Sequence, residues 1–284
     1  MPMRDIEISV IMPCYQDGQY LQEAINSVDL ERNLHTEIII IDDGSTDLLT
    51  CEILSKISHE RIRILHTDHA GPSAARNLGI RNALGEYILP LDADDRIELE
   101  YVGKARQVLE DHPEIGVVYC HADLFGAQSG PWKLPDYSFE RMLVQNLVFV
   151  SAMFRKKDWE AIGGFRTDMV FGMEDYDFFI GILALGKEIV QLPETMFHYR
   201  IKKNSRTTAF LGEQTQVKAT FRQIYAHHQA FYQKHAACYA CLLRDELIQE
   251  QYEKQKLMQA NELLLRLKRV VPMNWLAKRL FRNR

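Results

Sequence analysis

The chain has 284 residues, of which 46% are hydrophobic, 26% charged and 10% aromatic. This composition excludes a disordered or fibrous chain and is sufficient for one large domain or two fused smaller ones. The net charge of −5 also argues against the basic surface of a general nucleic-acid-binding protein.

The cysteine content and the hydropathy pattern indicate an intracellular protein without a membrane span. Five scattered cysteines do not form the framework of a disulfide-rich domain, so we expect a reducing, cytoplasmic compartment. No segment approaches the roughly 18–20 apolar residues that a spanning helix requires. The apolar run at residues 8–12 is too short and too weakly basic for a signal peptide, so we expect the mature chain to begin at residue 1.

Strand and helix patterns alternate over the first hundred residues. Apolar runs predict strands at residues 6–12, 37–41, 61–65 and 87–91, and helical spacing predicts helices at residues 20–28 and 74–84. The run at residues 37–41 is almost pure isoleucine, which is typical of a strand buried on both faces of a parallel sheet. This alternation predicts βαβ units around a parallel core sheet.

The pattern changes after residue 95. We expect a helix at residues 98–111, strands at 115–120 and 148–154, and a helix at 174–185 that Gly186 ends. From about residue 211 to residue 269 the sequence has little Gly or Pro, which predicts long helices. His227, His228 and His235 fall in this stretch. Because no acidic partner stands near them in a metal-ligand pattern, we expect them on a solvated helix face.

The first candidate site is the sequence DADD at residues 92–95, which directly follows the predicted strand at 87–91. Three carboxylates in four residues repel one another unless a cation joins them, and Mg²⁺ or Mn²⁺ prefers such oxygen ligands. Ligands of open parallel sheets collect at the carboxyl ends of strands, where this cluster falls. The alternative is a polar turn whose acids cap the next helix, from about residue 97.

Three further motifs are ambiguous when each is taken alone. The sequence DDGS at residues 42–45 follows a strand, but it is also an ordinary turn with a helix N-cap. The sequence AARN at residues 74–77 places a cation and an amide early in a helix, or exposes one arginine to solvent. Glu174 and Asp175 open a helix after the Gly-Gly-Phe sequence at 163–165. The helix dipole favours acids there, whereas aromatic neighbours raise a carboxylate pKa, a balance that suits a general base.

The order and spacing of these motifs carry more information than any one of them. Together with the sequence ISVIMPCY at residues 8–15 and the Tyr-Arg pair at 199–200, they resemble the inverting glycosyltransferases of family two, which have a GT-A fold. The resemblance covers about residues 6–205. It implies an α/β fold of the nucleotide-diphospho-sugar transferase type, in which helices flank a mostly parallel central sheet.

The resemblance also implies a domain organisation. A GT-A domain at residues 1–205 would consist of a nucleotide-binding half at about residues 1–115 and an acceptor half at 116–205. A helical C-terminal extension at residues 206–284 would follow it.

The resemblance further implies roles for individual residues. The positions implied in nucleotide binding are Pro13, Tyr15, Asp43, Gly44, Arg76, Asn77 and Asp92. Among these, Asp43 is the position that pairs with the base, usually uracil. The metal ion, Mn²⁺ or Mg²⁺, is assigned to Asp94 of the DxD motif, with Asp95 beside it. Asp175 matches the catalytic base, and Glu174 beside it contacts the acceptor or the donor.

The chain departs from the family pattern at one position. Many family members have a histidine two residues after the Tyr-Arg pair, where it helps to hold the metal or the diphosphate, but this chain has Lys202. A protonated lysine cannot bind a metal, although it can neutralise phosphate as a point charge. His198 lies on the opposite side of an extended segment and is a poor substitute. We therefore predict weaker metal dependence than usual, with Arg200 and Lys202 assisting the departure of the diphosphate.

The C-terminal end differs in charge from the rest of the chain. Residues 261–284 contain seven cationic side chains and one acidic side chain, a net charge of +6, which leaves −11 for residues 1–260. Residues 272–284 can form a helix with an apolar face of Met, Trp, Leu and Phe and with cations around it. Such a helix suits an anionic membrane interface. The alternative is a helix that docks on a partner or on the body of this protein.

The sequence therefore predicts an inverting, metal-assisted hexosyl- or N-acetylhexosaminyltransferase that uses a UDP-sugar. The expected acceptor is a hydroxyl of a lipid-linked glycan in surface polysaccharide biosynthesis, with the protein peripheral on the inner face of the cell membrane. One alternative is a catalytically silent family member that acts as a scaffold through its long C-terminal helices. Another is a sugar-phosphate nucleotidyltransferase, although residues 13–17 are not the Gly-rich, basic phosphate loop that such an enzyme needs.

Overall fold

The structure is a computed structural model that describes residues 5–202, 210 and 212–270. The chain divides into two compact units, Met1–Lys234 and His235–Arg284. The first unit is an α/β structure, and the described part of the second is the long helix α11, Ala236–Val270. The amphipathic helix predicted at residues 272–284 lies outside the described residues.

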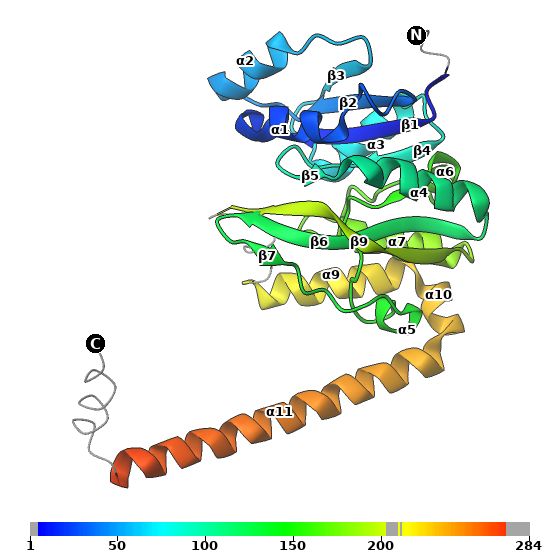
Figure 1. Ribbon diagram of the computed structural model, residues 1–284. Helices are drawn as coiled ribbons and strands as arrows, with labels where there is room; N and C mark the ends of the chain where they lie inside the picture. The colour runs from blue at the N-terminus through cyan, green and yellow to red at the C-terminus, as the bar shows by residue number, and fades with distance from the viewer. Residues whose placement is uncertain (1–4, 203–209, 211, 271–284) are drawn as a thin grey trace. The chain divides into compact units, whose positions relative to one another are not determined.

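In the first unit, nine strands of the described residues form one mixed sheet (Figure 1). Their order across the sheet is β3 (Ile62–His66), β2 (Thr36–Asp42), β1 (Ile8–Cys14), β4 (Tyr87–Pro90), β8 (Met153–Arg155), β6 (Ile115–Gly126), β9 (Glu188–Ile201) and β5 (Arg96–Ile97), and β7 (Gly130–Pro131) pairs with β6. Strands β1 to β4 are parallel to one another, as the sequence predicts for the first half. Strand β8 is antiparallel to both β4 and β6, whereas β6 and β9 are parallel.

Helices flank this sheet and bury its apolar strands. They are α1 (Gly18–Val28), α2 (Leu48–Lys56), α3 (Pro72–Asn82), α4 (Leu99–Asp111), α5 (Phe139–Met142), α6 (Lys156–Ile162), α7 (Glu174–Ala184), α9 (Gln214–His227) and α10 (Gln229–Lys234). Every residue of β2 is buried, which explains its run of isoleucines. Helix α3 packs on β1 and β2 and begins at Pro72, whose ring presets the backbone for a first helical turn. Because α9 and α10 belong to the first unit, the helical extension expected from residue 206 is divided between the two units.

Residues 116–205 differ from the strand prediction: β6 extends to Gly126, beyond the predicted strand at 115–120, and β7 was not predicted. The predicted strand at residues 148–154 is reduced to β8, although Leu147 and Val148 are buried. The long strand β9 was predicted only as an extended segment around Tyr199, because Pro193 and polar residues interrupt its apolar pattern. Pairing of β9 with β6 also shifts register on either side of His121. Burial alone therefore did not locate the strands in residues 116–205.

The expectation for two of the three C-terminal histidines is wrong. His227 and His228 lie at the end of α9, and both contact the buried carboxylate of Asp177 on α7. The Nδ1 atom of His227 is 2.7 Å from Asp177 Oδ1, and its Nε2 atom is 3.3 Å from a carboxylate oxygen of Asp168. Their acidic partners stand about fifty residues earlier in the chain. Local metal-ligand spacing therefore could not predict these contacts.

The described residues contain no helix that combines the length and the apolarity of a membrane span.

Candidate active site

The four motifs of the first unit converge at one edge of the sheet. Strands β1, β2 and β4 are parallel, so their carboxyl ends lie at the same edge. The residues that follow these strands are 15–17, 43–47 and 91–95, which include most of the predicted nucleotide and metal positions. In open α/β sheets this edge is the usual place of a ligand site.

The first part of the site is a loop pair around Asp43. Its carboxylate accepts hydrogen bonds from the backbone N–H groups of Ala70, at 2.7 Å, and Gly71, at 2.9 Å. Gly44 has a φ of +78°, and a Cβ atom there would lie 3.0 Å from the backbone nitrogen of His69. Asp43 thus fixes the loop that precedes α3.

An exposed aromatic pair borders the same loop. The rings of Tyr15 and His69 lie 4.2 Å apart between centroids, and Tyr15 follows directly on β1, beside the half-buried Pro13. Flat rings at such an edge offer a surface for a nucleobase. No local pattern points to His69, because its partner Tyr15 stands far earlier in the chain.

Arg76 joins the DADD motif at residues 92–95 to Glu174, which precedes the predicted catalytic base. Its side chain is buried, with the whole residue only 3% exposed. One terminal nitrogen donates to Asp92 at 2.8 Å and the other donates to Glu174 at 3.0 Å. Burial alone would lower the pKa of Arg76, but these two carboxylates together raise it, so the guanidinium stays charged. The solvent-exposed interpretation of this arginine is therefore wrong.

Asn77 holds the Gly-Gly-Phe loop against α3. Its side-chain oxygen accepts from Trp159 Nε1 and from the backbone N–H of Phe165, and its amide nitrogen donates to the Phe165 carbonyl. A Cβ atom on Gly164 would lie 2.7 Å from that oxygen, so only glycine fits. Asn77 is buried, and these contacts show a structural role for the side chain that was predicted to lie beside the nucleotide.

The carboxylates of Asp94 and Asp95 have different partners. Asp94 Oδ2 lies 2.8 Å from the Lys202 Nζ atom, which also donates to both oxygens of Asp17, at 2.9 and 3.0 Å. Burial alone would lower the pKa of Lys202, but Asp94 and Asp17 raise it, so the ammonium stays protonated. Asp95 is buried, and its Oδ1 atom accepts from the backbone N–H of Arg200 at 2.8 Å. Asp95 therefore anchors β9, and of the two predicted metal ligands only Asp94 lies in the half-exposed part of the site.

The guanidinium of Arg200 is held between two aromatic rings. It lies 4.3 Å from the Tyr20 ring centroid and 4.2 Å from that of Phe125. Its Nε atom donates to the Asp94 carbonyl at 2.7 Å, and a terminal nitrogen pairs with Glu23. Arg200 thus fixes the backbone of the metal motif, whereas Lys202 presents its charge to the Asp94 carboxylate.

These described side chains do not by themselves form a complete site for a divalent cation. Within residues 5–202, 210 and 212–270, no group of three or more His, Cys, Asp or Glu side chains could hold a metal ion. Asp92 is engaged by Arg76, and Asp95 by β9. Asp94 is half-exposed but paired with Lys202, so a bound Mn²⁺ or Mg²⁺ would need further ligands from a substrate.

Asp175 lies half-buried in the first turn of α7. Its Oδ1 atom accepts from the Tyr176 N–H at 2.8 Å, and its Oδ2 atom accepts from the Asn146 side-chain amide at 3.2 Å. Burial and then the neighbouring Glu174 carboxylate raise the pKa of Asp175 to about 6, although these hydrogen bonds and Arg76 oppose the rise. A carboxylate with this pKa is ionised at neutral pH and is still basic enough to accept a proton.

Comparison with known proteins agrees with this geometry. Residues 9–181, more than half of the chain, match the family described as Glycosyl transferase family 2. The chain belongs to this family. This family 2 chain is 42% identical over 120 residues to an uncharacterised glycosyltransferase of Rickettsia felis, a match that covers 42% of this chain and 19% of that protein. It thus spans about a fifth of the length of that curated relative.

Two solved structures share the fold of the family 2 chain. TarS of S. aureus, in complex with UDP, superimposes with a TM-score of 0.62 and 20% identity, over 78% of this chain and 65% of that one. The mannosyltransferase PcManGT of Pyrobaculum calidifontis, in complex with GDP-Man and Mn²⁺, gives a TM-score of 0.56 and 18% identity over 93% and 87%. The GT-A fold that the motifs implied is confirmed.

Proposed function

We propose that this chain transfers a sugar from a nucleotide-sugar donor to a hydroxyl of a glycan acceptor, with inversion at the anomeric carbon. The observation that carries the proposal is the buried Arg76 bridge between Asp92 and Glu174. It joins the motif predicted to face the donor and the motif predicted to hold the base, although Arg76 and Glu174 are 98 residues apart in sequence. This bridge supports one site with both groups that an inverting transfer needs.

In the proposed reaction, Asp175 acts as the general base. Its carboxylate takes the proton of the acceptor hydroxyl, and the acceptor oxygen forms a bond to the anomeric carbon. The bond from that carbon to the donor diphosphate breaks on the opposite face, so the configuration is inverted. Asn146 holds Asp175 Oδ2 and the backbone of Tyr176 holds Oδ1, which fixes the carboxylate for this transfer.

Lys202 supplies positive charge on the leaving-group side of the proposed site. The ammonium lies 2.8 Å from Asp94, where the family pattern expects a metal-supported diphosphate. A Mn²⁺ or Mg²⁺ ion held by Asp94 and the diphosphate would neutralise charge on the departing nucleotide. Because Lys202 already places one protonated group there, we expect the chain to depend less on the ion than a family member with histidine at this position.

Replacing Lys202 by alanine is expected to lower the transfer rate about 100-fold, the typical effect of removing one charge-stabilising donor. Replacing it by histidine should restore activity only in the presence of Mn²⁺, because neutral imidazole is a metal ligand and carries no charge of its own. Initial rates with and without Mn²⁺ test both variants. Lys56→Ala, an exposed lysine on α2, is the control. Unchanged transfer by Lys202→Ala would reject this role.

Replacing Asn146 by alanine is expected to move the acidic limb of the pH–rate profile upward by roughly 0.5–1 pH unit, which is one lost hydrogen bond to a carboxylate. The wild-type rate should fall as the pH drops through about 6, because Asp175 is then protonated. The Asn146 amide favours the ionised form, so its loss raises the pKa of Asp175. Asn82→Ala, an exposed amide on α3, should leave the limb in place; an unshifted limb in Asn146→Ala contradicts the proposal.

We propose a UDP-sugar as the donor and a lipid-linked glycan as the acceptor. Support for the nucleotide comes from the structure of TarS with UDP, whereas PcManGT is in complex with GDP-Man. Support for the lipid carrier comes only from the basic sequence of residues 272–284.

The test of the proposed function is release of nucleoside diphosphate from a panel of UDP-, GDP-, CDP- and dTDP-sugars, with and without added glycan. Release that depends on Asp175 and that an acceptor accelerates supports transfer. Release of inorganic pyrophosphate from a nucleoside triphosphate and a sugar phosphate would instead indicate a nucleotidyltransferase. Absence of both reactions would favour the silent scaffold.

A further inference from the structure

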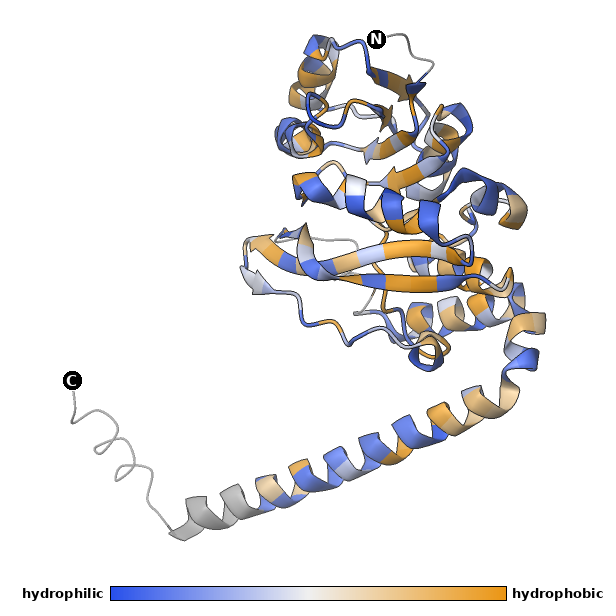
Figure 2. Cartoon of the chain, turned by 45° about the vertical axis from the view of Figure 1, so that its right-hand side comes forward, coloured by the Kyte–Doolittle hydropathy of each residue, from blue (hydrophilic) through white to orange (hydrophobic). Residues whose placement is uncertain are grey.

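Helix α11 is long and leaves its apolar side chains uncovered. It has 35 residues, or roughly 50 Å of helix. Along residues 236–262, where side chains are described, none is buried. Figure 2 shows apolar and polar residues interspersed along this helix. Helices in proteins gain most of their stability from packing an apolar face, so the exposed leucines of α11 call for a partner.

Four of the exposed apolar residues form one stripe. At 100° per residue, Leu243, Leu247, Leu257 and Met258 fall within about 100° of the helix circumference. They are 45%, 43%, 65% and 64% exposed, respectively. Such a stripe is wide enough for the contact face of a helix that packs against a single partner helix.

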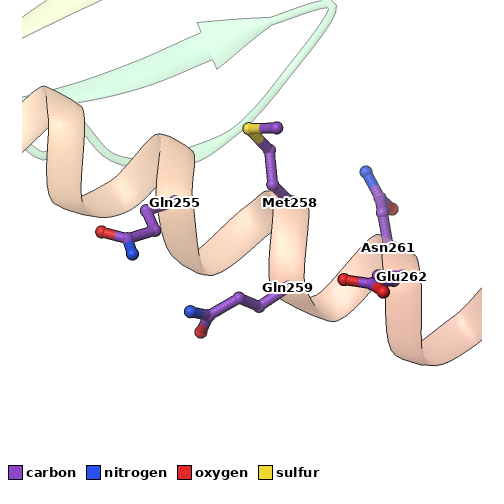
Figure 3. Close-up of a pocket in the computed structure, with 5 residues that line it drawn as sticks. All are labelled: Gln255, Met258, Gln259, Asn261 and Glu262. Carbon is purple, nitrogen blue, oxygen red and sulfur yellow. The ribbon is translucent and has the colours of Figure 1, made fainter.

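At Met258, the stripe borders a shallow hollow on α11. Figure 3 shows that Met258 and Asn261 point to one side of the helix and that Gln259 points to the opposite side. The hollow is lined by Gln255, Met258, Gln259, Asn261 and Glu262. All five belong to about two turns of one helix and cannot enclose a ligand, so this surface suits packing rather than a small molecule.

Two opposite charges interrupt the stripe at its centre. Glu250 and Lys254 lie on the same face as the four apolar residues, one turn apart and both exposed. In a parallel pair of α11 helices, each would face its own copy, and like charges would repel. In an antiparallel pair centred near Tyr252, Glu250 meets Lys254 of the second copy, and Leu247 meets the partner's Leu257.

The charged residues of α11 are also unevenly distributed, with acids in the first part and cations in the second. Residues 244–253 contain four acids and one cation, whereas residues 254–269 contain five cations and one acid. The helix dipole does not explain this, because its effect falls off within the first and last turns. Antiparallel pairing centred near Tyr252 places residues 244–253 of one copy along residues 251–260 of the other, which contain Lys254 and Lys256. Such polar positions set orientation in paired helices.

We propose that α11 pairs antiparallel with α11 of a second copy of this chain. The contact is formed by Leu243, Leu247, Leu257 and Met258, with crossed Glu250–Lys254 ion pairs at its centre. This inference is independent of the transferase reaction, since it uses no residue of the candidate active site.

Sedimentation velocity of the full chain over a concentration series tests the pairing. We expect a dimer for the wild type and for Lys256→Glu, and a monomer for Lys254→Glu over the same range. Lys254 and Lys256 give the same change in net charge, but Lys256 points to the far side of the helix, where it pairs with Glu253. Circular dichroism of both variants should show equal helix content.

A mixing experiment separates pairing between chains from a Glu250–Lys254 pair within one helix. Glu250→Lys and Lys254→Glu chains should each be monomeric, and an equal mixture should recover the dimer, because each chain then complements the other. A wild-type monomer throughout the series, equal behaviour of Lys254→Glu and Lys256→Glu, or a mixture that stays monomeric would each overturn the proposal.

Discussion

Replacing Asp175 by asparagine is expected to lower the rate of sugar transfer by about 100- to 10,000-fold, the usual contribution of a general base. The amide has nearly the same shape as the carboxylate but cannot accept the acceptor proton. Nucleotide affinity should stay near the wild-type value, because the carboxylate contacts Asn146 and Tyr176 rather than the loop around Asp43. Steady-state transfer rates and nucleotide titrations measure the two effects separately.

The control for this variant is Asp168→Asn, the same chemical change in an exposed residue of the preceding loop. Asp168 contacts His227 at 3.3 Å and should contribute to the docking of α9 without affecting proton transfer. We expect its transfer rate to stay within a few-fold of the wild type. If Asp175→Asn turns over as fast as Asp168→Asn, the assignment of the base is wrong.

Replacing Arg76 by methionine is expected to lower the free energy of unfolding by about 3–5 kcal/mol. Methionine fills much of the volume, but it leaves Asp92 and Glu174 without the charge that joins them. Loss of one partner from a buried ion pair costs this much because the remaining charges are uncompensated. Urea unfolding at neutral pH, followed by circular dichroism, measures the difference.

Two further variants make the Arg76 prediction specific. Arg81→Met lies on the same helix α3 with an exposed side chain, and a surface change of this kind should alter stability by no more than about 0.5 kcal/mol. Arg76→Lys keeps the charge but cannot donate to two carboxylates with the geometry of a guanidinium, so its stability should fall between the other two. A loss below about 1 kcal/mol for Arg76→Met would contradict a bridging role.

Strand periodicity was sufficient to predict β1 to β4. A strand buried on both faces has a continuous apolar run, so β2 was recognisable from its isoleucines, and the parallel order of β1, β2 and β4 placed three motifs at one edge. Helix α3 was equally clear because Pro72 marks its first turn. For β1, β2 and β4, local sequence reports burial directly.

Local sequence patterns could not predict contacts between residues that are distant in the chain. Arg76 has the same sequence context whether it faces solvent or bridges two carboxylates, and Glu174 lies 98 residues away. Asp95 stands beside Asp94 in the motif, yet it turns inward to the backbone of Arg200, 105 residues later. Asn146, which holds the proposed base, belongs to a segment without recognisable periodicity. These contacts depend on how residues 116–205 fold onto the first strands of the sheet.

The role of Lys202 was predicted from the sequence only in part. The sequence shows that Lys202 stands where many family members have histidine. This replacement led to the prediction that the lysine lies near the diphosphate. The structure adds that this ammonium is shared between Asp94 and Asp17. Asp17 follows β1 by three residues, so its place at the strand edge was a signal that sequence reasoning could have used.

Calorimetric titration with UDP, GDP, CDP and dTDP, each with and without Mn²⁺, tests the central claim that the strand ends form a nucleotide-sugar site. The account predicts that UDP binds preferentially, that Mn²⁺ strengthens this binding modestly because Lys202 already neutralises Asp94, and that Asp94→Ala removes the effect of Mn²⁺. Absence of binding by all four nucleotides, under conditions in which the chain is folded, would contradict it.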